Sequence, residues 1–125
     1  MKNGLLEINQ VLGVWGSVLC SNRGELIESV PPTGFNKTTL EDIGRKAVDL
    51  LSSAEKSVTG STEAVIHYSE RKMFLVDLKQ AILIVFCTPS VDIPLLRMTV
   101  NVITTRWQSD KKVQRRLENA AVDRI

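Results

Sequence analysis

The stretch from Ala81 to Cys87 constrains the fold most, because all seven of its residues are apolar. Spanning a bilayer takes about 20 residues, so this run is far too short to cross one. Its length and its β-branched and aromatic residues favour a strand over a buried helical turn. Alternate side chains of a strand point to opposite faces of a sheet. We therefore predict a central strand that helices cover on both faces.

Composition and charge indicate one ordinary globular domain. The chain has 125 residues, of which 43% are hydrophobic and 24% are charged, which is enough to build a substantial core. Its net charge of +2 comes from residues 110–125, which hold five basic and three acidic side chains, so residues 1–109 are formally neutral. A neutral body argues against a nucleic-acid-binding surface. Because we find neither a signal peptide nor a membrane span, we expect a cytoplasmic protein.

Hydrophobic periodicity and turn residues predict the order helix, two strands, helix, three strands, helix. The predicted elements are residues 3–12, 14–21, 25–29, 38–59, 62–69, 72–79, 81–87 and 93–107. Gly24 suits the tight turn between the first two strands, and Gly16 inside the first strand indicates the close approach of another backbone or a bulky side chain. Trp15 and Trp107 stand at core-like positions.

The signals for the middle and last helices lie at their ends. Thr38 and Glu41 form a capping box, and Gly60 would end the middle helix. Asp92 would cap the last helix, with Pro94 in its first turn. The side chains predicted to face the core from the middle helix are Leu40, Ile43, Ala47, Leu50, Leu51, Ala54 and Val58.

No set of residues in the chain suits catalysis or metal binding. His67 is the only histidine, so one chain cannot build a histidine-based triad or a histidine-rich metal site. Cys20 and Cys87 would lie about 20 Å apart along neighbouring antiparallel strands, whereas a disulfide needs Cα atoms within about 7 Å. We expect free core thiols, no enzyme activity and no cofactor.

The element order, the run Val14-Trp-Gly-Ser-Val-Leu19, the Asn22-Arg-Gly24 turn and the Met73–Phe86 hairpin resemble the Roadblock (dynein light chain) family. The resemblance covers about residues 5–108, and longin and profilin-like domains are close architectural relatives. It implies an α+β fold with a five-stranded antiparallel sheet of order 2-1-5-4-3. The first and last helices would cover one face and the middle helix the other, with residues 62–69 at an edge.

The resemblance also implies a homodimer. Family members join their edge strands into one continuous sheet while their middle helices pack side by side. The residues that this implies for the dimer interface are Gly44, Ala64, Val65, Ile66, His67 and Tyr68. A glycine inside a helix costs about 1 kcal/mol unless close packing uses it, and a tolerated surface glycine at position 44 is the alternative.

Members of this family hold or regulate small Ras-like GTPases, or serve as subunits of assemblies such as dynein motors. The resemblance therefore implies a non-enzymatic homodimer that binds a small Ras-like GTPase and modulates its nucleotide cycle, as a candidate GTPase-activating protein, or its localisation. Another Roadblock or longin chain is a further possible partner. Helix phase places a partner-binding surface on Arg45, Lys46, Asp49 and Ser53. The alternatives are an adaptor subunit of a motor or scaffold complex, and a longin-like or profilin-like sensor that binds a peptide or small ligand.

Residues 110–125 lie outside the resemblance. Val113, Leu117 and Ala121 follow one another at spacing four, next to basic side chains. We expect a frayed or loosely helical tail, with a partner-docking helix and a membrane-surface helix as alternatives.

Overall fold

The predicted central strand is β5 (Ala81–Cys87), and all seven of its residues are buried. The structure is a computed structural model that describes residues 1–52 and 62–122. The other elements are α1 (Lys2–Asn9), β1 (Val14–Ser21), β2 (Leu26–Val30), α2 (Lys37–Ser52), β3 (Thr62–Tyr68), β4 (Arg71–Asp77), α3 (Ile93–Ser109) and α4 (Lys111–Val122).

The strands form one five-stranded sheet in the order β2-β1-β5-β4-β3, and every neighbouring pair is antiparallel. Val85 of β5 pairs with Ser17 of β1 on one side and with Phe74 of β4 on the other. The predicted strand order is therefore confirmed, and β2 and β3 form the two edges.

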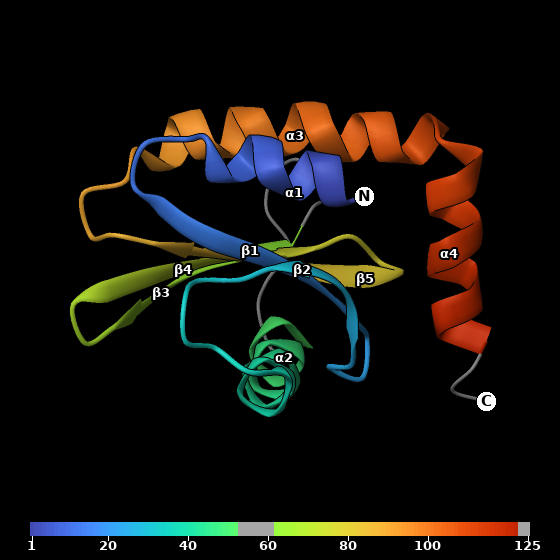
Figure 1. Ribbon diagram of the computed structural model, residues 1–125, viewed down its shortest axis with the longest axis horizontal. Coiled ribbons are helices and arrows are strands. Elements are labelled where there is room, and N and C mark those ends of the chain that lie inside the picture. Colours follow the sequence, from blue (N-terminus) through green and yellow to red (C-terminus); the bar gives the residue numbers. More distant parts are fainter. Residues whose placement is uncertain (53–61, 123–125) are drawn as a thin grey trace.

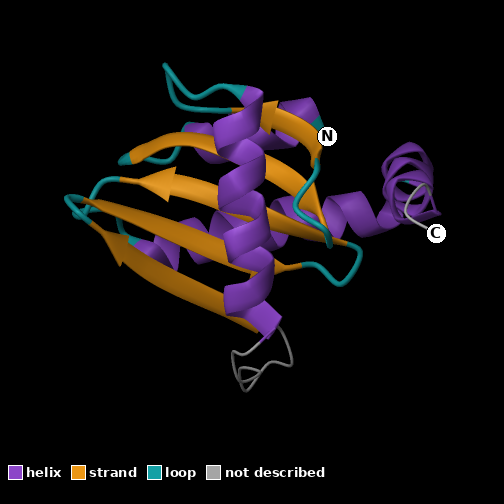
Figure 2. Cartoon of the chain, turned by 90° about the horizontal axis from the view of Figure 1, so that it is seen from below, coloured by secondary structure: helices purple, strands orange, loops and turns teal. Residues whose placement is uncertain are grey.

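Helices cover both faces of the sheet (Figure 1), because β5 directs apolar side chains to each face in turn. Leu83, Val85 and Cys87 pack in the core beneath α1, α3 and α4. Ile82, Ile84 and Phe86 pack in the core beneath α2, which crosses the strands in Figure 2. Burying each large side chain contributes about 1.5–3 kcal/mol, so β5 anchors both layers.

The helix ends depart from the prediction most clearly at the end of α1 and the start of α2. Helix α1 ends at Asn9 rather than at residue 12, and Leu12 is 90% exposed. Helix α2 begins at Lys37, because the Asn36 side chain accepts a hydrogen bond from the Thr39 amide at 2.8 Å and so takes the capping role given to Thr38. Gly60, predicted to end this helix, lies outside the described residues.

Glu41, the second member of the predicted capping box, accepts a hydrogen bond from the Leu26 amide at 3.3 Å and ties α2 to β2. The predicted start of α3 is confirmed, because the Asp92 carboxylate accepts a hydrogen bond from the Leu95 amide. The close approach predicted at Gly16 is also confirmed, since a Cβ there would lie 2.5 Å from the Pro32 nitrogen.

The tail that we predicted to be frayed or loosely helical forms the regular helix α4 over residues 111–122, which stands across the end of α3 in Figure 1. Val113 and Leu117 are 4% and 3% exposed, in the same core as α1 and α3. The Asp110 carboxylate accepts a hydrogen bond from the Val113 amide at the start of this helix. Two apolar side chains on one helical face and this cap stabilise the helix more than the predicted frayed or loosely helical tail implied.

The Arg116 guanidinium of α4 also forms an ion pair with Glu28 of β2 at 2.7 Å. Within the two described ranges, no helix combines the length and the apolar character needed to cross a membrane.

Candidate functional site

A groove of about 470 Å³ runs between α2 and the strands β3 and β4. Its α2 wall is formed by Thr39, Asp42, Ile43, Lys46, Ala47 and Leu50, and its floor and far side by Ile66, Tyr68, Arg71, Lys72, Met73, Leu75 and Phe86, with Trp15, Phe35 and Cys87 at one end. Leu50 is 43% exposed and Tyr68 is 67% exposed. The groove is therefore an accessible and largely apolar surface.

This groove exists because the apolar face of α2 is wider than the part of the helix that touches the sheet. Leu40, Ala47 and Leu51 are buried against the strands, as predicted. Ile43 is only half-buried, and Leu50 lines the groove instead of the core. The core prediction for Leu50 was therefore wrong, because helical phase alone does not show where the sheet ends beneath the helix. Ala54 and Val58 lie outside the described residues.

The predicted dimer residues on β3 lie together on the edge strand. Ala64, Val65 and Ile66 are half-buried, and His67 and Tyr68 are exposed. The β3 residues pair with β4 on one side, and β3 ends the strand order. Ile66 and Tyr68 also line the groove beside α2, so the edge and the groove form one continuous surface.

Gly44 lies elsewhere. It is buried, and a Cβ at this position would lie 2.7 Å from the Gly24 carbonyl oxygen and 3.0 Å from the Cys20 sulfur. This glycine therefore lets α2 pack closely on the turn between β1 and β2. Its small size is explained within one chain, and we remove it from the predicted dimer interface.

The described partner-binding residues, Arg45, Lys46 and Asp49, are all exposed on α2 but have different neighbours. Lys46 lines the groove, whereas the Arg45 backbone lies against Gly24 at the β1–β2 turn and its guanidinium forms an exposed ion pair with Asp42. Asp49 is exposed, and Ser53 lies outside the described residues. The structure therefore places Lys46 beside β3 and β4, and it places the Arg45 backbone beside the β1–β2 turn while the guanidinium reaches Asp42 at the groove.

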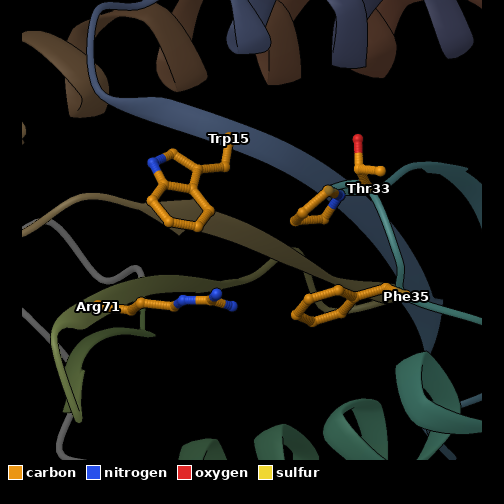
Figure 3. Close-up of a pocket in the computed structure, with 5 residues that line it drawn as sticks. Trp15, Thr33, Phe35 and Arg71 are labelled. Atoms are coloured by element: carbon orange, nitrogen blue, oxygen red, sulfur yellow. The ribbon is translucent and has the colours of Figure 1, made fainter.

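At one end of the groove, Trp15, Phe35 and Arg71 point toward one another (Figure 3). They line a smaller cavity of about 330 Å³ together with Pro32 and Thr33. Trp15 is 46% exposed, so the prediction that it belongs to the core was wrong. The sequence signal for this cavity was weak, because its residues come from β1, from the loop before α2 and from β4, and only the fold brings them together.

The two cysteines contribute no reactive group. Both are free and buried, and burial raises the pKa of Cys20 to about 12 and that of Cys87 to about 11. Thiols with such pKa values are protonated near neutral pH and react slowly. Among the described residues, no three His, Cys, Asp or Glu side chains gather into a metal site.

Neither a protein-family model nor a curated protein matches the sequence. Solved structures do match the fold. A Roadblock/LC7 domain from Streptomyces avermitilis superposes with a TM-score of 0.69 at 14% identity, over 87% of this chain and 95% of that one. A structure described as MglB with a tetrameric arrangement gives a TM-score of 0.65 at 12% identity, over 94% and 88%. The gliding protein MglB from Thermus thermophilus gives 0.62 at 10% identity, over 94% and 88%.

Proposed function

We propose, from the Roadblock/LC7 fold of this chain, that it is a non-enzymatic homodimer that binds a small Ras-like GTPase in the cytoplasm. Binding would modulate the nucleotide cycle of the GTPase or its location. The observation that carries this proposal is the superposition with Roadblock/LC7 and MglB structures over 87–94% of the chain, which supports the Roadblock resemblance of the sequence and the small-GTPase role that this resemblance implies. At 10–14% identity this likeness establishes the fold, and the function is our inference from it.

The edge strand and the groove support self-association. An uncovered edge strand presents backbone N–H and C=O groups that can pair with another strand. In an isologous dimer the same surface of each copy meets its counterpart. Pairing two β3 strands would bring the groove of each copy next to the α2 helix of the other, and Leu50 and Tyr68 would lose their exposure to water. The tetrameric arrangement named for one MglB structure is consistent with a surface that binds copies of itself.

The exposed polar residues of α2 are the proposed GTPase surface. Arg45, Lys46 and Asp49 are all exposed, and with the predicted Ser53 they would contact the partner. A regulator of this kind acts by binding one conformation of the partner's switch segments more tightly than the other. In this proposal the chemistry of GTP hydrolysis remains with the GTPase.

The test is the mass of the purified chain by light scattering, alone and with a GTP-loaded or GDP-loaded Ras-like GTPase from the same genome. We expect a two-chain mass that grows with the GTP-loaded partner, together with a changed rate of GTP hydrolysis or nucleotide exchange. A two-chain mass that no GTPase changes would contradict the GTPase proposal and leave the dimer standing.

The surface is tested by Arg45→Glu combined with Lys46→Glu. Reversing two exposed charges should weaken GTPase binding by about tenfold or more. Because Lys46 also lines the groove beside β3, Arg45→Glu alone is the variant in which the mass of the dimer should stay unchanged. The matched control is Lys111→Glu combined with Lys112→Glu, at two exposed positions of α4. Equal affinity in the α2 double variant and the wild type would remove α2 from the partner surface.

A further inference from the structure

In the cavity at the end of the groove, two aromatic rings hold the positively charged side chain of Arg71 in place. The Arg71 guanidinium carbon lies 4.6 Å from the centroid of the Trp15 ring and 5.9 Å from that of the Phe35 ring. The Phe35 ring is itself held by an edge-on contact with Phe86, with the ring centroids 5.3 Å apart. Aromatic faces attract a guanidinium through the ring quadrupole. These contacts hold the guanidinium of an exposed arginine in one place.

Among the described residues, none forms an ion pair with the guanidinium of Arg71. The ion pairs in that part of the chain join Arg45, Arg97, Arg106 and Arg116 to carboxylates. Stacking uses the faces of the guanidinium plane, whereas hydrogen bonds use its edges. Arg71 is thus a positioned cation, and stacking leaves the edges of its guanidinium for hydrogen bonds at the cavity.

The size of the cavity limits what it can hold. At about 330 Å³ it is at the lower end of the range for ligand pockets, about 300–1,000 Å³. Its other walls are Trp15, Pro32, Thr33 and Phe35, so apolar and aromatic surface surrounds the one cation. A single side chain with an apolar stem and a polar end suits such a cavity better than a nucleotide does.

The charge of the cavity determines which polar group suits the end of the bound side chain. A carboxylate carries one negative charge and can accept two parallel hydrogen bonds from a guanidinium. A phosphate monoester carries about 1.5–2 negative charges near neutral pH, and Arg71 is the one cationic residue among those that line the cavity. One cation matches the charge of a carboxylate and leaves that of a phosphate partly uncompensated.

We propose that the cavity formed by Trp15, Phe35 and Arg71 binds an aspartate or glutamate side chain of a partner protein. The carboxylate would accept hydrogen bonds from Arg71, and its methylene groups would pack on Pro32 and the two rings. The large groove shares Trp15, Phe35 and Arg71 with this cavity, so an apolar residue next to the acidic one would enter the groove. The site lies within one chain and needs no GTPase, whereas the groove beside it is the surface that a second copy would cover in the proposed dimer.

The experiment selects random heptapeptides, displayed on phage, for binding to the full chain. The same selection is run against the Arg71→Gln variant, and the enrichment of each peptide is compared between the two. We expect enriched peptides to share an acidic position next to an apolar one, and to lose enrichment with the Arg71→Gln variant. The most enriched peptide is then titrated into the protein while the two indole N–H signals are followed by NMR. The signal of Trp15 should shift, whereas that of Trp107, which is 6% exposed, should stay in place.

Matched variants define the role of the guanidinium. Arg71→Gln, and replacement of the acidic residue of the peptide by its amide, should each weaken binding by about tenfold or more. Arg71→Lys keeps the positive charge but cannot donate two parallel hydrogen bonds, and it should give an intermediate loss of affinity. Arg23→Gln, at an exposed arginine of the β1–β2 turn, should change nothing, and thermal unfolding of all variants shows that they are folded.

Three results would overturn the proposal. The first is no enrichment, or enrichment without an acidic position. The second is equal peptide affinity in the wild type and Arg71→Gln. The third is a Trp15 shift with inorganic phosphate that the acidic peptide does not reproduce, which would identify a site for free oxyanions rather than for a protein side chain.

Discussion

The two edge strands of the sheet differ in how far the rest of the chain covers them. At β2, the Asn9 side chain from α1 donates to the Val30 carbonyl at 3.2 Å, and Arg116 from α4 donates to the Ile27 carbonyl. All five β2 residues are half-buried. At β3, by contrast, the strand ends in exposed His67 and Tyr68.

The chain also contacts β3 at one end through the ion pair between Glu63 and Arg97 of α3. Beyond this contact, the exposed end of β3 continues into an open apolar groove. Sheet edges invite pairing with other chains, and proteins cover the edges that must stay unpaired. Side chains of α1 and α4 thus cover the β2 edge, whereas the described part of the chain leaves the end of β3 exposed. This difference is why we propose β3 as the edge that pairs with a second chain.

The largest expected effect is a loss of stability when a buried side chain that holds α4 beside β2 is removed. Leu117→Ala deletes a side chain that is 3% exposed, and such changes cost about 2–5 kcal/mol because a cavity remains. We expect the free energy of unfolding, measured in urea, to fall by about 3 kcal/mol. Amide hydrogen exchange in β2 should also rise.

The control for this prediction is Arg115→Ala, at an exposed position of the same helix, which should change stability by less than about 0.5 kcal/mol. A loss below about 1 kcal/mol for Leu117→Ala would show that α4 does not unfold together with the rest of the domain.

A lysine on the β3 edge should act on assembly rather than on folding. Tyr68 is 67% exposed, so Tyr68→Lys removes little packing within one chain. In the proposed dimer it would place two like charges near an apolar interface, and we expect dimer dissociation to become at least about tenfold easier. Sedimentation over a concentration series measures this change. Thr105→Lys, on the exposed surface of α3, is the control, and a dimer that tolerates Tyr68→Lys as well as Thr105→Lys would place the interface elsewhere.

The smallest expected effect is a pH-dependent change in stability from the ion pair at the β2 edge. Burial raises the pKa of Glu28, but hydrogen bonds from Arg116 and from the Ser29 amide outweigh it and hold this pKa below its ordinary value of 4.5. A carboxyl whose pKa is lowered by folding stabilises the fold above its ordinary pKa, and this contribution disappears as the pH falls. Arg116→Gln should therefore reduce stability by about 0.5 kcal/mol near neutral pH.

The difference between Arg116→Gln and the wild type should shrink as the pH falls through the lowered pKa of Glu28, and vanish once Glu28 is protonated in both folded and unfolded chains. Urea unfolding at several pH values measures it. A difference that persists unchanged in acid would show that Arg116 acts through its hydrogen bond to the Ile27 carbonyl and not through the Glu28 carboxylate.

Local patterns predicted most of the fold. The apolar run of β5 predicted a strand covered on both faces because alternation leaves no face for water, and every residue of it is buried. Asp92 and Pro94 predicted the start of α3, since a cap depends on residues close in sequence. Predictions that depended on distant residues were less accurate. Glu41 was assigned to its own helix and instead bonds β2.

The candidate site was predictable only in part. The β3 residues that form its edge followed from the strand order, and the exposed position of Lys46 followed from helical phase. The cavity of Trp15, Phe35 and Arg71 was missed because these residues are far apart in sequence, and each alone suggests only a core aromatic residue or a solvated charge. No periodic pattern links them.

By itself the sequence determined the order of helices and strands as far as α3, the central place of β5 and, through its single histidine, that one chain cannot build a histidine-based site. These follow from side-chain periodicity, turn residues and composition, which act over a few residues. The tertiary structure decided that α4 closes the β2 side, that Gly44 serves packing within the chain, and that Arg71 lies between two aromatic rings. Those outcomes depend on which distant surfaces meet, and a contact between residues far apart in the chain leaves no local pattern in the sequence.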